Sequence, residues 1–174
     1  MTFRQMLKPP RLRTIATACA LLVLPMHVGA QRVAISRQDS TVLFVCEHGT
    51  VKSLLAKLLF DQYAGEVGLP MRAISRGTAV DSTVPPWMQA ALTADHLVVG
   101  TFRPLALQAS DLTRATFVVS FDVPSAATAS ATAPRAQWDG LPSVSQNYSA
   151  GRDAIRMRVK QLVDSLKRAQ STRR

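Results

Sequence analysis

In this chain of 174 residues, a cysteine, a lysine and a serine lie close together in the sequence. They follow directly on the apolar run at residues 42–45. Five residues separate Cys46 from Lys52, and Ser53 follows directly. A cysteine thiolate is a nucleophile, and a nearby cation or helix N-terminus stabilises the thiolate over the thiol. This combination indicates a site where a sulfur atom attacks an anion or holds it.

The residues around Cys46 predict the elements that such a site needs. Residues 42–45 are all apolar, with β-branched and aromatic members, which is typical of a buried strand in a parallel sheet. A short loop over residues 47–51 contains Gly49, and a helix is predicted to begin near Lys52. Backbone amides converge in such a turn, the helix end carries partial positive charge, and glycine relieves steric limits on the backbone.

The rest of the chain alternates between strand-like and helix-like segments. Further strands are predicted at residues 71–75, 116–121 and 136–138. Helices are predicted at residues 52–64, 87–94, 107–112 and 150–170, and a loop with a marginal helical turn at residues 125–134. Alternation of this kind indicates an α/β fold with a parallel sheet and helices on both faces, in which ligands bind beyond the carboxyl ends of the strands.

The pattern of Cys46, Lys52 and Ser53 after an apolar strand resembles the phosphate-binding loop of the low-molecular-weight protein tyrosine phosphatases. The related thioredoxin-coupled arsenate reductases carry the same loop, and the shared family pattern is C-x5-R-S. The turn at residues 75–78 and the segment at residues 101–105 add to the resemblance, which covers nearly all of residues 41–168. It implies a three-layer α/β fold with a four-stranded parallel sheet.

The resemblance also implies roles for individual residues. Cys46 would be the nucleophile, Lys52 the cation that holds the oxyanion, and Ser53 the hydroxyl that stabilises the thiolate. An aspartate from a distant loop would protonate the leaving group, with Asp139 as the first candidate and Asp122 as the second. Backbone amides of the loop would bind the phosphate oxygens, namely those of Glu47, His48, Gly49, Thr50 and Val51. No cofactor is expected, and no metal site, because His48 has no partner at metal-ligand spacing.

Three positions depart from the family pattern. Lys52 replaces an arginine, and a point-like ammonium matches two phosphate oxygens less well than a planar guanidinium, so we expect weakened transition-state stabilisation. Glu47 places a carboxylate in the loop, where it repels an anion if it faces inward. Asp139 lies several residues before the position where the family has its aspartate, and the alternative role for it is to cap a turn.

The first thirty residues have the three parts of a secretory signal peptide. Four cations without an acid precede an apolar run over residues 15–28, and small residues end at Ala30. The run is shorter than the ~20 residues that a membrane span needs, and Pro25 interrupts it. We therefore expect cleavage after Ala30, export to the periplasm or the medium, and no stable membrane insertion. A flexible leader over residues 31–40, a domain over residues 41–170 and a basic tail over residues 171–174 would follow.

Cleavage would leave Cys46 as the only cysteine, because Cys19 lies in the predicted signal. An intrachain disulfide and an internal thiol relay would then both be impossible. The predicted mature chain carries 17 Lys and Arg against 11 Asp and Glu, a net charge of +6. This balance comes with few aromatic residues and no nucleic-acid motif, so we expect a phosphorylated protein or a small phosphate ester as partner and no nucleic acid.

These observations leave three hypotheses for the function. The first is an exported phosphatase that hydrolyses phosphotyrosine-like or small aryl phosphate esters, with activity weakened by Lys52. The second is a non-catalytic module that keeps the loop and only binds phosphate or another oxyanion. The third is an arsenate reductase that uses external thiols, because a second thiol is missing from the predicted mature chain.

Overall fold

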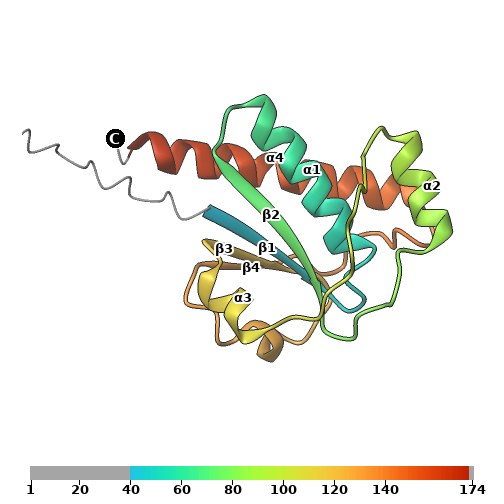
Figure 1. Cartoon of the computed structure of the whole chain (residues 1–174). Coiled ribbons are helices and arrows are strands. Elements are labelled where there is room, and N and C mark those ends of the chain that lie inside the picture. Colours follow the sequence, from blue (N-terminus) through green and yellow to red (C-terminus); the bar gives the residue numbers. More distant parts are fainter. Residues whose placement is uncertain (1–39, 173–174) are drawn as a thin grey trace, which may run out of the picture. The chain divides into compact units, whose positions relative to one another are not determined.

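The computed structural model describes residues 40–172, and the predicted signal peptide and most of the predicted leader lie outside the described residues. Figure 1 shows a parallel sheet with helices above and below it. Within the described part of the chain, no helix is both long and apolar enough to cross a membrane.

The sheet has four strands in the order β2-β1-β3-β4, and every pairing is parallel. The strands are β1 (Ser40–Cys46), β2 (Met71–Gly77), β3 (Phe117–Ser120) and β4 (Arg135–Gln137). The five residues at the end of β1, residues 42–46, are all buried, as the unbroken apolar run predicts for a central strand. The predicted four-stranded α/β fold is therefore confirmed.

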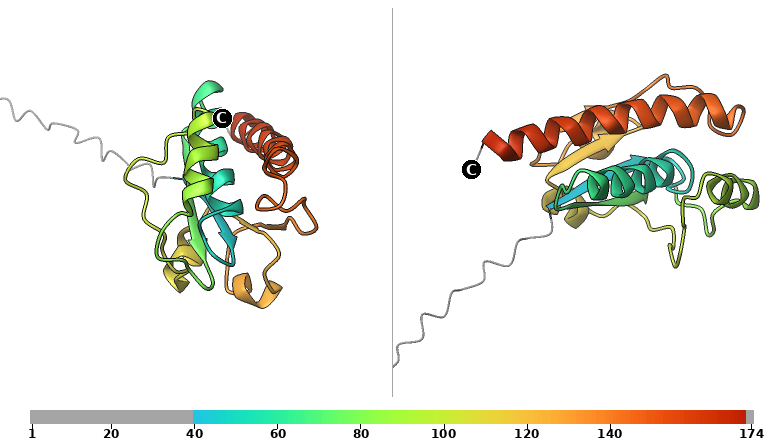
Figure 2. Two further views of the ribbon diagram at one scale, coloured as in Figure 1. Left: turned by 90° about the vertical axis from the view of Figure 1, so that its right-hand side faces the viewer. Right: turned by 90° about the horizontal axis from the view of Figure 1, so that it is seen from above.

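Four helices flank this sheet, namely α1 (Lys52–Glu66), α2 (Pro86–Ala94), α3 (Ala109–Arg114) and α4 (Tyr148–Thr172). Alternate residues of β1 point to opposite faces, so Val42 and Phe44 pack with α1 and α4 in the larger core cluster. Leu43 and Val45 pack with Leu112 of α3 in a smaller cluster on the other face. The two faces are visible in the turned views (Figure 2). This arrangement gives the three layers.

The boundaries predicted from the sequence agree closely with those of the structure. β2 extends two residues beyond the predicted end at residue 75, because its last residues pair with β1 as far as Cys46. The segment at residues 125–134, predicted as a loop with a marginal helical turn, contains the one-turn 3₁₀ helix η1 (Ser125–Thr128).

The topology brings four loops to the same end of the sheet. β1 ends at Cys46, and Asp81 and Asp122 follow the ends of β2 and β3. The loop after β4 reaches this end with residues 143–145 before α4 begins. Because the strands are parallel, their carboxyl ends form one edge, and this is where such folds place their ligand sites.

Candidate active site

A cavity of about 480 Å³ opens at the carboxyl end of the sheet. All four loops contribute to its wall. The residues that line it are Cys46, Glu47, His48, Val51, Lys52, Asp81, Pro85, Phe121, Asp122, Ser143, Val144 and Ser145. The predicted nucleophile and the predicted cation therefore face the same space.

The sulfur of Cys46 lies at the buried side of this cavity, with the residue only 6% exposed. The amide of Gly49 donates a hydrogen bond to Sγ at 3.2 Å, and the hydroxyl of Ser53 lies 3.0 Å from Sγ. A thiolate accepts both of these donors, so the surroundings of the sulfur suit its charged, nucleophilic form. The predicted contact between Cys46 and Ser53 is present.

A second serine, Ser75 of β2, extends this hydrogen-bonded chain. Its hydroxyl lies 2.8 Å from the oxygen of Ser53 and 2.9 Å from the carbonyl oxygen of Gly49. When Cys46 is a thiol, it donates to Ser53, Ser53 donates to Ser75, and Ser75 donates to the carbonyl oxygen of Gly49. When Cys46 is a thiolate, only two protons remain, so Ser53 turns to the sulfur and Ser75 turns to Ser53. Ser75 belongs to the turn at residues 75–78 that adds to the family resemblance, but its position in the sequence does not predict this contact with Ser53.

The loop itself is fixed by the segment that follows β2. Amides of Thr78, Ala79 and Asp81 donate to the carbonyl oxygens of Cys46, Glu47 and His48, at 3.1, 2.8 and 3.1 Å respectively. In a trans peptide the N–H points opposite to the C=O. The amides that follow these three carbonyls therefore point away from residues 78–81, and one of them is the Gly49 amide that reaches the sulfur.

Two glycines make this close backbone packing possible. Gly49 has a φ of +73°, which glycine adopts without strain. A Cβ on Gly49 would lie 2.8 Å from the amide nitrogen of Gly77, and a Cβ on Gly77 would lie 2.8 Å from the carbonyl carbon of His48. The loop and the end of β2 are therefore packed backbone against backbone.

The N-terminus of α1 completes the cradle. Val51 occupies the N-cap position without a side-chain hydrogen bond, and the first turn of this helix has no acidic residue. Free amides at a helix N-terminus and the partial positive charge of the helix end together attract an anion. The phosphate-binding role of residues 47–51 stays a prediction, with which this geometry agrees.

Lys52 is not free in the cavity. Its ammonium forms an ion pair with the carboxylate of Asp122, and the amide of Gly140 donates to the other carboxylate oxygen at 3.0 Å. Partial burial acts to raise the pKa of Asp122, but the hydrogen bonds from Lys52 and Gly140 and the charge of Lys52 outweigh it and lower the pKa. Asp122 is therefore held in its ionised form.

Asp139 contacts the backbone of Asp122 and is not among the described residues that line the cavity. Its Oδ1 accepts a hydrogen bond from the amide of Asp122 at 2.8 Å, and its Oδ2 accepts one from Gln137 at 2.6 Å. These contacts match the alternative role of capping a turn. That Asp139 protonates the leaving group stays a prediction, and Asp122, the second candidate, lines the cavity.

His48 and Asp81 form a pair at the wall of the cavity. Nδ1 of His48 lies 3.2 Å from Oδ1 of Asp81, and the buried hydroxyl of Thr50 donates to Oδ2 of Asp81 at 2.7 Å. Glu47 lies on the same side, with a side chain that is 66% exposed. The cavity therefore faces three carboxylates and one ammonium, a balance that the sequence alone did not reveal.

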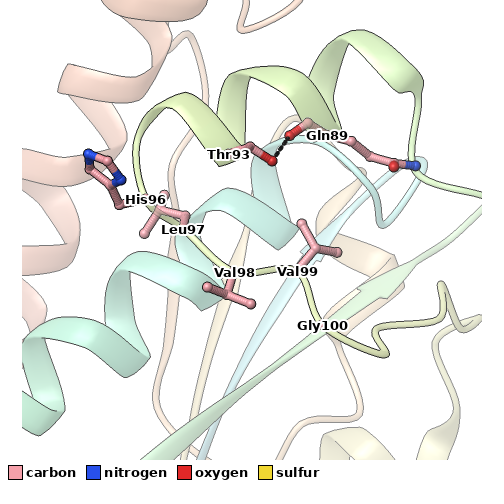
Figure 3. A pocket seen from close by; sticks show the side chains of 7 residues that line it. All are labelled: Gln89, Thr93, His96, Leu97, Val98, Val99 and Gly100. Atoms are coloured by element: carbon pink, nitrogen blue, oxygen red, sulfur yellow. Dashed lines mark hydrogen bonds between the residues drawn. The ribbon is translucent and has the colours of Figure 1, made fainter.

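A second cavity, of about 470 Å³, lies at the end of α2 (Figure 3). Its lining residues are Gln89, Thr93, His96, Leu97, Val98, Val99 and Gly100. This set contains neither a thiol nor a cation. The cavity beside Cys46 is the one that offers a nucleophile and an anion cradle.

The fold is a parallel α/β sheet with a cavity that is lined by a cysteine at the carboxyl end of its strands. The family model "Low molecular weight phosphotyrosine protein phosphatase" matches residues 41–172, so the chain belongs to this family. The resemblance seen in the sequence is thereby confirmed. No curated protein sequence matches the chain.

Solved structures agree with this fold. YfkJ from Bacillus subtilis is 17% identical, with a TM-score of 0.67 over 75% of this chain and 96% of that chain. The arginine phosphatase YwlE from Geobacillus stearothermophilus is 19% identical, with a TM-score of 0.65 over 78% and 97%. A thioredoxin-dependent arsenate reductase from Corynebacterium glutamicum is 20% identical, with a TM-score of 0.63 over 78% and 65%.

Proposed function

We propose that the chain is an exported phosphatase in which Cys46 attacks the phosphorus of a phosphate monoester. The observation that carries this proposal is the placement of the Cys46 sulfur. It lies at the floor of a cavity, 3.2 Å from the Gly49 amide and 3.0 Å from the Ser53 hydroxyl. The family match supports a reaction on a phosphorylated substrate.

The reaction would proceed in two displacements. The thiolate of Cys46 forms a sulfur–phosphorus bond as the bond from phosphorus to the leaving oxygen breaks. Water then attacks phosphorus, the sulfur–phosphorus bond breaks, and phosphate leaves. Loop amides and the ammonium of Lys52 hold the equatorial oxygens in both steps, where the negative charge develops.

Lys52 limits the rate in this proposal for two reasons. Its ammonium is a point charge, so it cannot grip two phosphate oxygens as a guanidinium does. It is also paired with Asp122, which already neutralises much of its charge. An ammonium has three donors and can hold Asp122 and a phosphate oxygen together, so activity is weakened rather than abolished.

Hydrolysis of an aryl phosphate tests this function. We expect the wild-type protein to release phosphate in a reaction that Cys46→Ala abolishes. The variant Lys52→Arg restores the planar guanidinium that the family has at this position, and it should raise kcat. Equal slow release by the wild type and Cys46→Ala would overturn the catalytic proposal.

A non-catalytic oxyanion-binding module is the second candidate, favoured by the ion pair between Lys52 and Asp122. In this case the cradle binds phosphate without forming a bond to sulfur. Titration calorimetry with inorganic phosphate would show binding in the wild type, while no phosphate release is seen from any aryl ester, even in Lys52→Arg.

Arsenate reduction with external thiols remains the third candidate, supported by the likeness to the arsenate reductase. Cys46 is the only free cysteine among residues 40–172, so the disulfide partner would have to come from another molecule. Consumption of added thiol that depends on both arsenate and Cys46 would support this candidate over the phosphatase.

Export is part of the proposal and rests on the three-part pattern of residues 1–30. Expression of the full chain in a bacterial host, followed by mass analysis of the protein from the periplasm and the medium, tests it. We expect a mature chain that begins at Gln31. An uncleaved chain found only in the cytoplasm would contradict export.

A further inference from the structure

The proposed phosphatase reaction needs a proton for the leaving oxygen, and the described wall of the cavity offers few sources. Asp122 is held ionised by Lys52, because its pKa is lowered. The polar side chains that the loop after β4 contributes to the wall are the hydroxyls of Ser143 and Ser145, which lie 3.0 Å from each other. Hydroxyls of this kind are weak acids and do not serve as proton donors near neutral pH.

His48 differs from these groups, since imidazole is the side chain that most often serves as a general acid or base in enzymes. It lines the same cavity as Cys46. Its Nδ1 lies 3.2 Å from Oδ1 of Asp81, so this nitrogen is paired with the carboxylate. The other nitrogen, Nε2, is then the one that exchanges a proton with a substrate.

Asp81 is itself held in place. The hydroxyl of Thr50, which is fully buried, donates to Oδ2 at 2.7 Å, and the amide of Asp81 donates to the carbonyl of His48 at 3.1 Å. Nε2 of His48 lies 3.7 Å from a carboxylate oxygen of Glu47, within ion-pair distance but beyond hydrogen-bond range. Nδ1 of His48 is therefore held by Asp81, and Nε2 remains to exchange a proton with a substrate.

We propose that His48, oriented by Asp81, is the acid and base of the reaction at Cys46. This inference rests on the proposed phosphatase function and deepens it. His48 would be a catalytic residue, because it touches the leaving group, and Asp81 a positioning residue. The other charged groups at this wall are Glu47, Lys52 and Asp122.

The two steps balance as follows. As Cys46 attacks phosphorus, the bond to the leaving oxygen breaks and Nε2–H of the imidazolium gives its proton to that oxygen. The imidazole is then neutral. In the second step Nε2 takes a proton from the attacking water, the sulfur–phosphorus bond breaks, and the thiolate and the imidazolium are restored.

Leaving groups of different basicity test this assignment. In His48→Asn, whose amide can still donate to Asp81, kcat/KM for phenyl phosphate should fall by about 100-fold or more, the range of general acid catalysis. The value for 2,4-dinitrophenyl phosphate should change little, because its leaving group departs without a proton. His48→Gln should behave in the same way. A merely structural role for His48 would lower both rates equally.

His96 supplies the matched control. It lines the separate cavity at α2, and its φ of +58° is one that asparagine tolerates (Figure 3). His96→Asn should leave both substrates unaffected. Equal losses for both esters in His48→Asn and in His48→Gln would overturn the proposal, as would a loss confined to phenyl phosphate in Asp139→Asn or Glu47→Gln but not in His48→Asn.

Different results would contradict the phosphatase function and the role of His48. If wild-type protein does not turn over 2,4-dinitrophenyl phosphate at all, the phosphatase function fails and takes this inference with it. If wild type turns it over in a reaction that needs Cys46, while His48→Asn shows no dependence on the leaving group, only the role of His48 is lost.

Discussion

Gly77 is the position where a single added methyl group tests the packing of the loop. A Cβ there would lie 2.8 Å from the carbonyl carbon of His48, 2.9 Å from the carbonyl oxygen of Glu47 and 3.0 Å from the amide nitrogen of Gly49. All three are backbone atoms, so no side chain can rotate away. Ordinary contact begins near 3.4 Å, and the loop must retreat by about 0.6 Å.

This retreat acts on the atoms that surround the sulfur of Cys46. The Gly49 amide that donates to Sγ belongs to the displaced segment. A misplacement of ~1 Å in an active site costs on the order of 100-fold in rate, so we expect Gly77→Ala to lower kcat/KM for an aryl phosphate by at least tenfold. Overpacking should also lower the free energy of unfolding by about 1–3 kcal/mol.

The control is Gly65→Ala in α1, because a Cβ at that position meets nothing within 4 Å. Alanine is a better helix former than glycine, so this variant should gain about 0.5–1 kcal/mol in urea unfolding and keep its activity. Aryl phosphate hydrolysis and urea unfolding would be measured side by side. A Gly77→Ala protein as active as Gly65→Ala would refute the claim that β2 holds the loop in its working geometry.

Three further variants address the charges and hydroxyls of the site. Asp122→Asn releases Lys52, so the affinity for inorganic phosphate should rise in calorimetry; unchanged or weaker binding would show that the ion pair does not compete with the anion. The pKa of Asp122 is lowered from 3.8 in the folded state, so its contribution to stability is present above that pH and is lost as the pH falls through the folded pKa. The difference in the free energy of unfolding between wild type and Asp122→Asn should therefore shrink on acidification. A difference that widens would contradict this sign. Lys52→Arg should raise kcat for an aryl phosphate by about tenfold or more, on the scale of one oxyanion donor, with KM changed less; a fall in kcat would mean that the loop cannot seat the guanidinium. Ser75→Ala should slow alkylation of Cys46 by iodoacetamide, because the hydrogen bond that Ser75 donates polarises the Ser53 hydroxyl and strengthens its own bond to the thiolate. An unchanged alkylation rate would show that Ser75 does not act on the sulfur.

The fold could be predicted from the sequence because its signals are local. The apolar run of β1 and the helical spacing of α4 predict buried elements at those places, and the structure has them there. Cys46 and Ser53 could be placed because strand, loop and helix follow one another directly, so their spacing alone sets the contact.

The remaining parts of the site depend on contacts between distant segments. Asp122 meets Lys52 from 70 positions away in the chain, and Ser75 meets Ser53 from 22 positions away. Asp81 reaches His48 only because the segment after β2 pairs with the loop. The spacing of residues along the chain does not predict these contacts, and it also did not predict that Asp139 accepts a hydrogen bond from the amide of Asp122.

The most direct test of the account is detection of the phosphorylated cysteine itself. Wild-type protein would be mixed with 2,4-dinitrophenyl phosphate, quenched in acid within milliseconds to seconds, digested and analysed by mass spectrometry. We expect one phosphoryl group on the peptide that contains Cys46, absent in Cys46→Ala. Release of dinitrophenol from wild type without any phosphoryl group on this peptide at any quench time would contradict the claim that this sulfur is the nucleophile.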